Sequence, residues 1–170
     1  MATIRTALVA AALALFATGA NAQGFNYDLF KPTTLAEAKA DFLSDATKPN
    51  PAVQDRVGNS YLDQGGRRWR AEAAYTGRSR TLDADELLFI GYWLKSVSRP
   101  DVISQFTTSY LFTAGDKEYW LPVEEPVAAF FPKELKLGDS IELYLAEIGG
   151  THRKDGWAWL PLVEEFRKAE

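Results

Sequence analysis

The sequence contains no cysteine, and its 170 residues include only one histidine, His152, and one methionine. Without cysteine the chain has no disulfide bond, thiolate zinc site, iron–sulfur ligand or thiol nucleophile. A single imidazole also excludes most histidine-based metal sites and catalytic triads. We therefore expect neither a metal nor a cofactor.

An excess of positive charge is also missing, since 19 basic residues face 23 acidic ones for a formal net charge of −4. Dedicated nucleic-acid-binding domains are usually strongly basic, so we expect no nucleic-acid partner. The longest apolar run, residues 7–17, is shorter than the roughly 20 residues that cross a bilayer, which predicts no stable membrane insertion. The 46% hydrophobic content is typical of a folded domain.

Residues 1–22 have the pattern of a secretory signal peptide. Arg5 precedes the apolar run, and Asn21 between two alanines forms an A-x-A cleavage site. We predict cleavage near Ala22 and a periplasmic location, with secretion as the alternative. The competing interpretation of this segment is a buried N-terminal helix.

The remaining residues, 23–170, have the length of one ordinary domain. Thr34 and Glu37 have the spacing of a capping box and predict a helix over 35–46. We expect Phe42 and Leu43 of this helix to pack on a neighbouring surface. The apolar positions at helical spacing are Leu35, Ala38, Phe42, Leu43 and Ala46.

Alternating apolar and polar residues predict a strand over 67–77, which we expect Gly77 to end. Asp83 and Glu86 then have capping-box spacing at the start of a broadly apolar stretch. That stretch predicts a second helix over 84–97, packed against a sheet.

Residues 104–166 are predicted to form an antiparallel β region. A Gly115–Asp116 turn closes a hairpin, and Pro126 begins a short helical turn that plugs one end of a sheet. Two further strands follow, the first of which we expect Gly149 and Gly150 to end. Pro161 restricts the last strand to an edge or a bulge.

The predicted fold class is α+β, with a five-stranded, mainly antiparallel sheet or a partly closed barrel, two helices and a short helical turn. Five strands with a helical turn between the third and fourth resemble the oligonucleotide/oligosaccharide-binding (OB) barrel. The helix over 84–97 would be an insertion after the first strand. The alternative is an open sheet that helices cover on one face.

Two groups of residues are candidates for catalysis. His152 titrates near neutrality, and Asp155 is close enough in sequence to orient it as a general base. Glu124 and Glu164, if adjacent strands bring them together, would resemble the carboxylate pair of a glycosidase. The alternative is that these groups are a solvated loop histidine and surface carboxylates.

The segment 67–80 carries a local excess of arginine, and its guanidinium groups could bind anions. Nearby aromatic residues would then complete a binding surface. The candidate binding residues are Arg68, Arg70, Arg78, Arg80, Trp120, Tyr144 and Trp157. In the alternative interpretation, outward arginines of this strand pair with Glu118, Glu142 or Glu164 on neighbouring strands.

These observations favour a non-enzymatic binding or protein-interaction module of the cell envelope. Its partner would be an acidic protein or an anionic or oligosaccharide component of the envelope. The alternative function is a cofactor-free hydrolase that uses His152 or the Glu124 and Glu164 pair. The sequence predicts no oligomeric state.

Overall fold

The structure is a computed structural model that describes residues 24–46, 54–57, 60–63, 66–152 and 156–169. Within these ranges, side chains are described except for residues 46, 54–57, 60–63, 151–152 and 156–157. The predicted signal peptide, residues 1–22, lies outside the described part of the chain.

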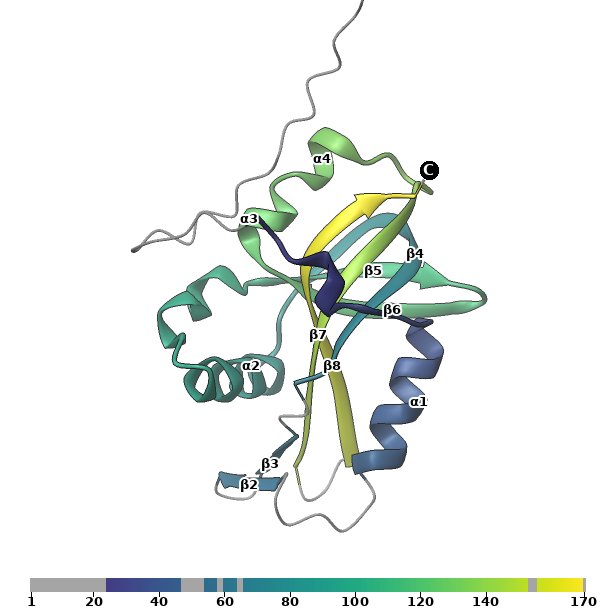
Figure 1. Ribbon diagram of the computed structural model, residues 1–170. Coiled ribbons are helices and arrows are strands. Elements are labelled where there is room, and N and C mark those ends of the chain that lie inside the picture. The colour runs from purple at the N-terminus through teal and green to yellow at the C-terminus, as the bar shows by residue number, and fades with distance from the viewer. Residues whose placement is uncertain (1–23, 47–53, 58–59, 64–65, 153–155, 170) are drawn as a thin grey trace, which may run out of the picture.

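The described residues form helices and strands, and all the strands belong to one continuous hydrogen-bonded sheet (Figure 1). In chain order they are η1 (Tyr27–Leu29), β1 (Lys31–Pro32), α1 (Leu35–Ala46), β2 (Gln54–Val57), β3 (Ser60–Asp63), β4 (Arg68–Thr81), α2 (Ala84–Ser96), η2 (Pro100–Gln105), β5 (Thr108–Ala114), β6 (Lys117–Val123), α3 (Glu125–Ala128), α4 (Phe131–Glu134), β7 (Ser140–His152) and β8 (Gly156–Lys168).

Five of the strands close into a barrel in the order β4, β5, β6, β8, β7, because β7 pairs with β4 again. Within the barrel, neighbouring strands are antiparallel except β6 and β8, which are parallel. This order, with one parallel seam, confirms the predicted α+β, OB-like barrel. The barrel is therefore mixed rather than wholly antiparallel, and the open-sheet alternative is wrong.

Two predicted strand ends are wrong. Gly77 does not end β4, which continues to Thr81 after a shift of register between Tyr75 and Ser79. The glycines at 149 and 150 do not end β7, which continues to His152. A Cβ at 149 would overlap the Phe42 ring of α1, so this glycine allows the helix to approach the strand closely.

Both predicted long helices are confirmed, and both predicted capping boxes form. Glu37 N–H donates to Thr34 Oγ1 at 3.1 Å, and Thr34 N–H donates to the Glu37 carboxylate at 3.1 Å. The second helix ends one residue earlier than predicted, at Ser96. Phe42 is buried as expected, whereas Leu43 is exposed.

The barrel interior is mostly apolar, and α3 and α4 cover one end of it (Figure 1). One helical turn was predicted there, and the structure has two. The ring of Phe131, in α4, is fully buried against the rings of Tyr75, Tyr110, Phe112 and Phe166, with centroid distances of 4.9–6.1 Å. The predicted plug therefore exists and is built around a single phenylalanine.

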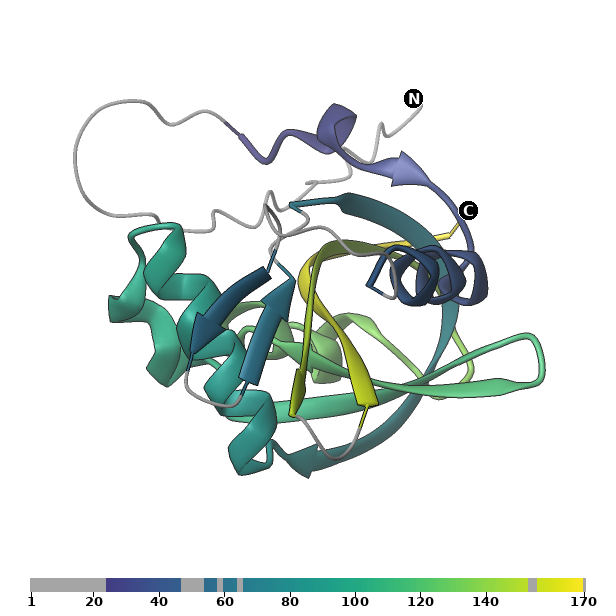
Figure 2. The same ribbon diagram turned by 90° about the horizontal axis from the view of Figure 1, so that it is seen from below.

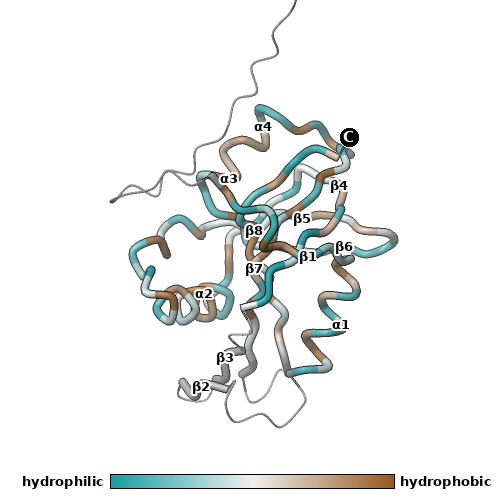
Figure 3. Tube along the Cα trace, viewed as in Figure 1, coloured by the Kyte–Doolittle hydropathy of each residue, from teal (hydrophilic) through white to brown (hydrophobic). Residues whose placement is uncertain are grey.

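A second apolar cluster lies outside the barrel, where α2 and η2 pack on β7 and β8. Figure 2 shows α1 and α2 on different sides of the barrel. The hydropathy tube in Figure 3 shows hydrophobic segments along α2 and on the strands at the centre of the molecule. The insertion between β4 and β5 is therefore part of the core rather than an appended arm.

Candidate functional site

Each arginine proposed for binding has an acidic partner. The pairs are Arg68 with Glu164 at 3.5 Å, Arg70 with Glu142 at 3.2 Å, Arg78 with Glu118 at 3.5 Å, and Arg80 with Glu86 at 2.5 Å. Three of these partners are the residues that the alternative interpretation named, so that interpretation is confirmed.

The arginines do not form one surface. Arg70 pairs with Glu142 of β7, whereas Arg78 pairs with Glu118 of β6. The two arginines are eight residues apart in β4 and lie on either side of its register shift. Only Arg78 and Arg80 reach the aromatic candidate Trp120. The two guanidinium carbons lie over its ring at 5.8 and 5.2 Å from the centroid.

Tyr144 is not a surface residue, so its prediction as a binding residue is corrected. Its side chain is 1% exposed because the N-terminal segment covers it. The rings of Phe25, Tyr27 and Phe30 lie 4.9–5.7 Å from the Tyr144 ring between centroids. Burial, followed by its hydrogen bond to Glu142, raises the pKa of Tyr144 to about 12. This phenol is therefore a packing residue.

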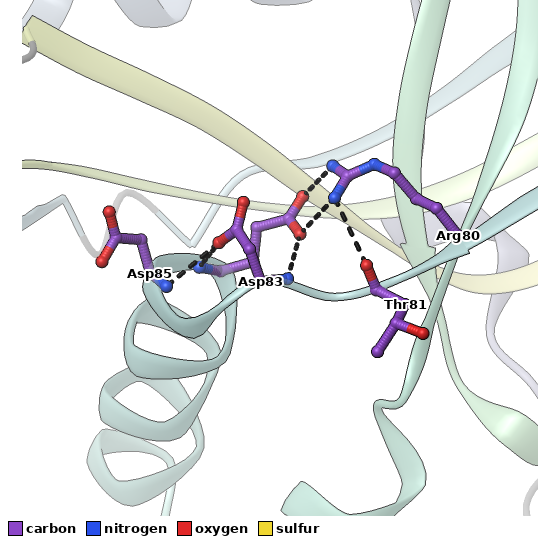
Figure 4. Close-up of polar contacts among 5 residues, drawn as sticks. Arg80, Thr81, Asp83 and Asp85 are labelled. Atoms are coloured by element: carbon purple, nitrogen blue, oxygen red, sulfur yellow. Dashed lines mark hydrogen bonds and ion pairs between the residues drawn. The ribbon is translucent and has the colours of Figure 1, made fainter.

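The remaining cluster of Arg78, Arg80 and Trp120 is called the Arg–Trp surface here. Arg80 is its fixed member, because both of its terminal nitrogens donate to Glu86, at 2.5 and 2.9 Å. Glu86 is held in turn by the capping box of α2, where Asp83 N–H donates to it at 2.9 Å (Figure 4). The start of α2 thus positions one guanidinium group on Trp120.

A β-bulge positions Arg78. Thr76 Oγ1 donates to the Leu111 carbonyl at 2.6 Å and accepts from Arg78 N–H at 3.3 Å. Gly77 between them has a φ of 72°, in the left-handed region that favours glycine. Bulges of this kind redirect a side chain, and here Arg78 is directed towards Trp120.

The structure brings Glu124 and Glu164 together. Val123 of β6 pairs with Val163 of β8 at the parallel seam, and each glutamate follows one of these valines. Burial, and then the charge of Glu164, raises the pKa of Glu124 to about 7, while Arg99 opposes the shift. Burial also raises the pKa of Glu164, against the lowering effect of Arg68. Two adjacent carboxylates therefore differ in their tendency to ionise.

Two other candidates, His152 and Trp157, are described only in their backbone, and a third, Asp155, is not described. The backbone of His152 pairs with Ser60 and Gly156 at the end of β7, so it lies in a strand rather than in the predicted loop. Its side chain and that of Trp157 are outside the description. Asp155 also lies outside the described residues. The proposed imidazole–carboxylate pair is therefore untested.

A buried carboxylate, Glu147, was missed by the sequence analysis. It is 2% exposed and accepts hydrogen bonds from the indole N–H groups of Trp69 at 3.0 Å and Trp159 at 3.1 Å. Arg67 Nε lies 2.5 Å from Glu147 Oε1 as an ion pair without hydrogen-bond geometry, and Arg67 also bonds Asp45 of α1 at 2.7 Å. Burial raises the pKa of Glu147, and its partners oppose this. The sequence pattern did indicate this burial, since Glu147 continues the inward-facing alternation of Leu143 and Leu145 along the strand.

Within the described side chains, no group of three or more histidine, aspartate or glutamate residues is arranged to hold a metal ion. Among the described helices, none is long and apolar enough to cross a membrane. No protein-family model matches the chain, and no curated protein or solved structure matches it either.

Proposed function

We propose that the chain is a non-enzymatic binding module, exported to the periplasm or secreted after cleavage near Ala22. Its ligand is anionic, either an acidic protein or an anionic or oligosaccharide component of the cell envelope. The observation that carries the proposal is that two guanidinium groups lie over the single Trp120 ring. OB barrels commonly bind ligands on the face formed by their second and third strands, which correspond here to β5 and β6.

The test is a pull-down from detergent-solubilised envelope with the purified protein as bait, at low and high salt. Arg78→Gln should lose the captured component, and high salt should weaken capture because the contact is electrostatic. Arg70→Gln is the matched control, since Arg70 is another ion-paired arginine of β4 whose partner, Glu142, lies on β7 rather than on β6 with Trp120. Equal capture by wild type, Arg78→Gln and Arg70→Gln would refute this surface.

A cofactor-free hydrolase is the second candidate function. The adjacency of Glu124 and Glu164 favours it, because a carboxyl group whose pKa is raised to about 7 suits general acid catalysis beside a second carboxyl group. A screen of glycoside and ester substrates should then detect hydrolysis that falls at least about 100-fold in Glu124→Gln. Wild-type protein without turnover on any substrate would remove this candidate.

A further inference from the structure

We infer that Arg78 is a receptor for a carboxylate of an acidic protein segment, and that Glu118 occupies this receptor while the segment is absent. This inference rests on the proposed binding function. It assigns different roles to the two arginines of the Arg–Trp surface and gives Glu118 the role of an internal competitor.

The position of Arg78 is built into the backbone. The Thr76 side chain bonds both the Leu111 carbonyl and the Arg78 N–H, which fixes the bulge around Gly77. The bulge sets the direction in which the Arg78 side chain leaves the strand, and the guanidinium carbon lies 5.8 Å from the centroid of the Trp120 ring without a ligand present. Such preorganisation lowers the cost of binding.

The two ion pairs of the surface differ in how easily they exchange. Arg78 and Glu118 are 63% and 59% exposed at the side chain and 3.5 Å apart. Glu86, by contrast, is 12% exposed and makes two bonds to Arg80. Exposed single-contact pairs contribute little to stability, so an incoming carboxylate can replace Glu118 at small cost. Arg80 keeps its partner and holds Trp120.

The chemistry of the surface favours an acidic protein segment over a sugar. A guanidinium fork matches a carboxylate, and the receptor already holds the carboxylate of a glutamate side chain. Sugars bind by stacking on an open aromatic face, whereas Arg78 and Arg80 both lie over the Trp120 ring. The Trp120 ring is therefore already in contact with two guanidinium groups.

The test is fluorescence anisotropy with a labelled ten-residue glutamate-rich peptide, and with a glutamine-rich peptide of the same length as control. Glu118→Gln should bind the acidic peptide at least threefold more tightly than wild type. Arg78→Gln should weaken binding at least tenfold, and Arg78→Lys should weaken it by less, because lysine keeps the charge without the planar fork. Glu72→Gln, an exposed glutamate of β4, controls for the loss of one negative charge.

Unchanged or weaker peptide binding by Glu118→Gln overturns the inference, even if Arg78→Gln still loses its envelope partner. Binding of polygalacturonate but not of the acidic peptide also overturns it and leaves the proposed function in place. Failure of the proposed function looks different, because then neither probe binds and the envelope pull-down is empty. Thermal midpoints close to wild type establish that each variant is folded.

Discussion

Glu124 lies beside Glu164 on the outer wall of the barrel, because each residue follows one valine of the Val123 and Val163 pair that joins β6 to β8. This is the parallel seam that closes the barrel. Two carboxylates therefore meet at the place where closure depends on a single register pair. Their ionisation should affect how firmly the barrel closes.

The first prediction concerns pH. The pKa of Glu124 is raised from 4.5 to about 7 in the folded protein, so folding favours its protonated form. Its contribution to stability is fully present below about pH 4.5 and is lost as the pH rises through about 7, a loss on the order of 2 kcal/mol. Denaturant unfolding between pH 5 and 8 should show this decline in wild type and a flatter profile in Glu124→Gln. Glu72→Gln controls for the loss of one negative charge. The same dependence of stability on pH in wild type and Glu124→Gln would contradict the raised pKa of Glu124.

The second prediction concerns Glu147. Replacing it with alanine leaves the part-buried indole N–H groups of Trp69 and Trp159 without their acceptor and removes the buried counter-charge of Arg67. The free energy of unfolding should fall by about 3–5 kcal/mol. Asp45→Asn weakens the half-exposed ion pair with Arg67, keeps Glu147 in place, and should lower the free energy of unfolding by less than about 1 kcal/mol. Urea denaturation measures both. A loss in Glu147→Ala no larger than in Asp45→Asn would contradict this role.

The third prediction concerns Gly149. An alanine there would overlap the Phe42 ring and place its Cβ 2.6 Å from the Ala158 carbonyl oxygen, so α1 and β8 must shift. We expect a loss of about 1–3 kcal/mol from overpacking. Adding Phe42→Leu should recover only part of it, because the Ala158 carbonyl belongs to the backbone. Complete recovery in the double variant, measured by thermal unfolding, would show that the backbone contact is unimportant.

The fourth prediction concerns the plug of the barrel. Phe131→Ala removes a fully buried ring from contact with four other rings and should destabilise the protein by about 3–5 kcal/mol. Phe130→Ala, at the partly buried neighbour, should cost far less. Calorimetry of the two alanine variants checks the difference. Similar losses of stability in Phe131→Ala and Phe130→Ala would contradict the claim that the plug is built around Phe131.

Much of the fold was predictable because it depends on local signals. The capping boxes at Thr34 and Asp83 predicted where both long helices begin, and alternation predicted the inward face of β4. Glycine was misleading at 77 and at 149, because its role there depends on a bulge and on a helix that packs from elsewhere in the chain. A local sequence pattern does not contain these tertiary contacts.

The candidate site was predictable only in part. Pairing of β4 arginines with Glu118, Glu142 and Glu164 followed from charge and alternation. The burial of Tyr144 could not be predicted from the sequence, because the rings that cover it come from the N-terminal segment, more than a hundred residues away in sequence. The proximity of Glu124 to Glu164 also required the parallel seam.

The most direct test of the central claim is site-specific photocrosslinking in whole cells. A photoreactive amino acid at Thr113, which pairs with Glu118 in the β5–β6 register, should form a covalent adduct with the envelope ligand. The same group at Ala40, on the exposed side of α1, should form none. Adduct formation that Arg78→Gln abolishes is the result we predict. Adducts from neither position, or equally from both, would contradict a binding module that acts through the Arg–Trp surface.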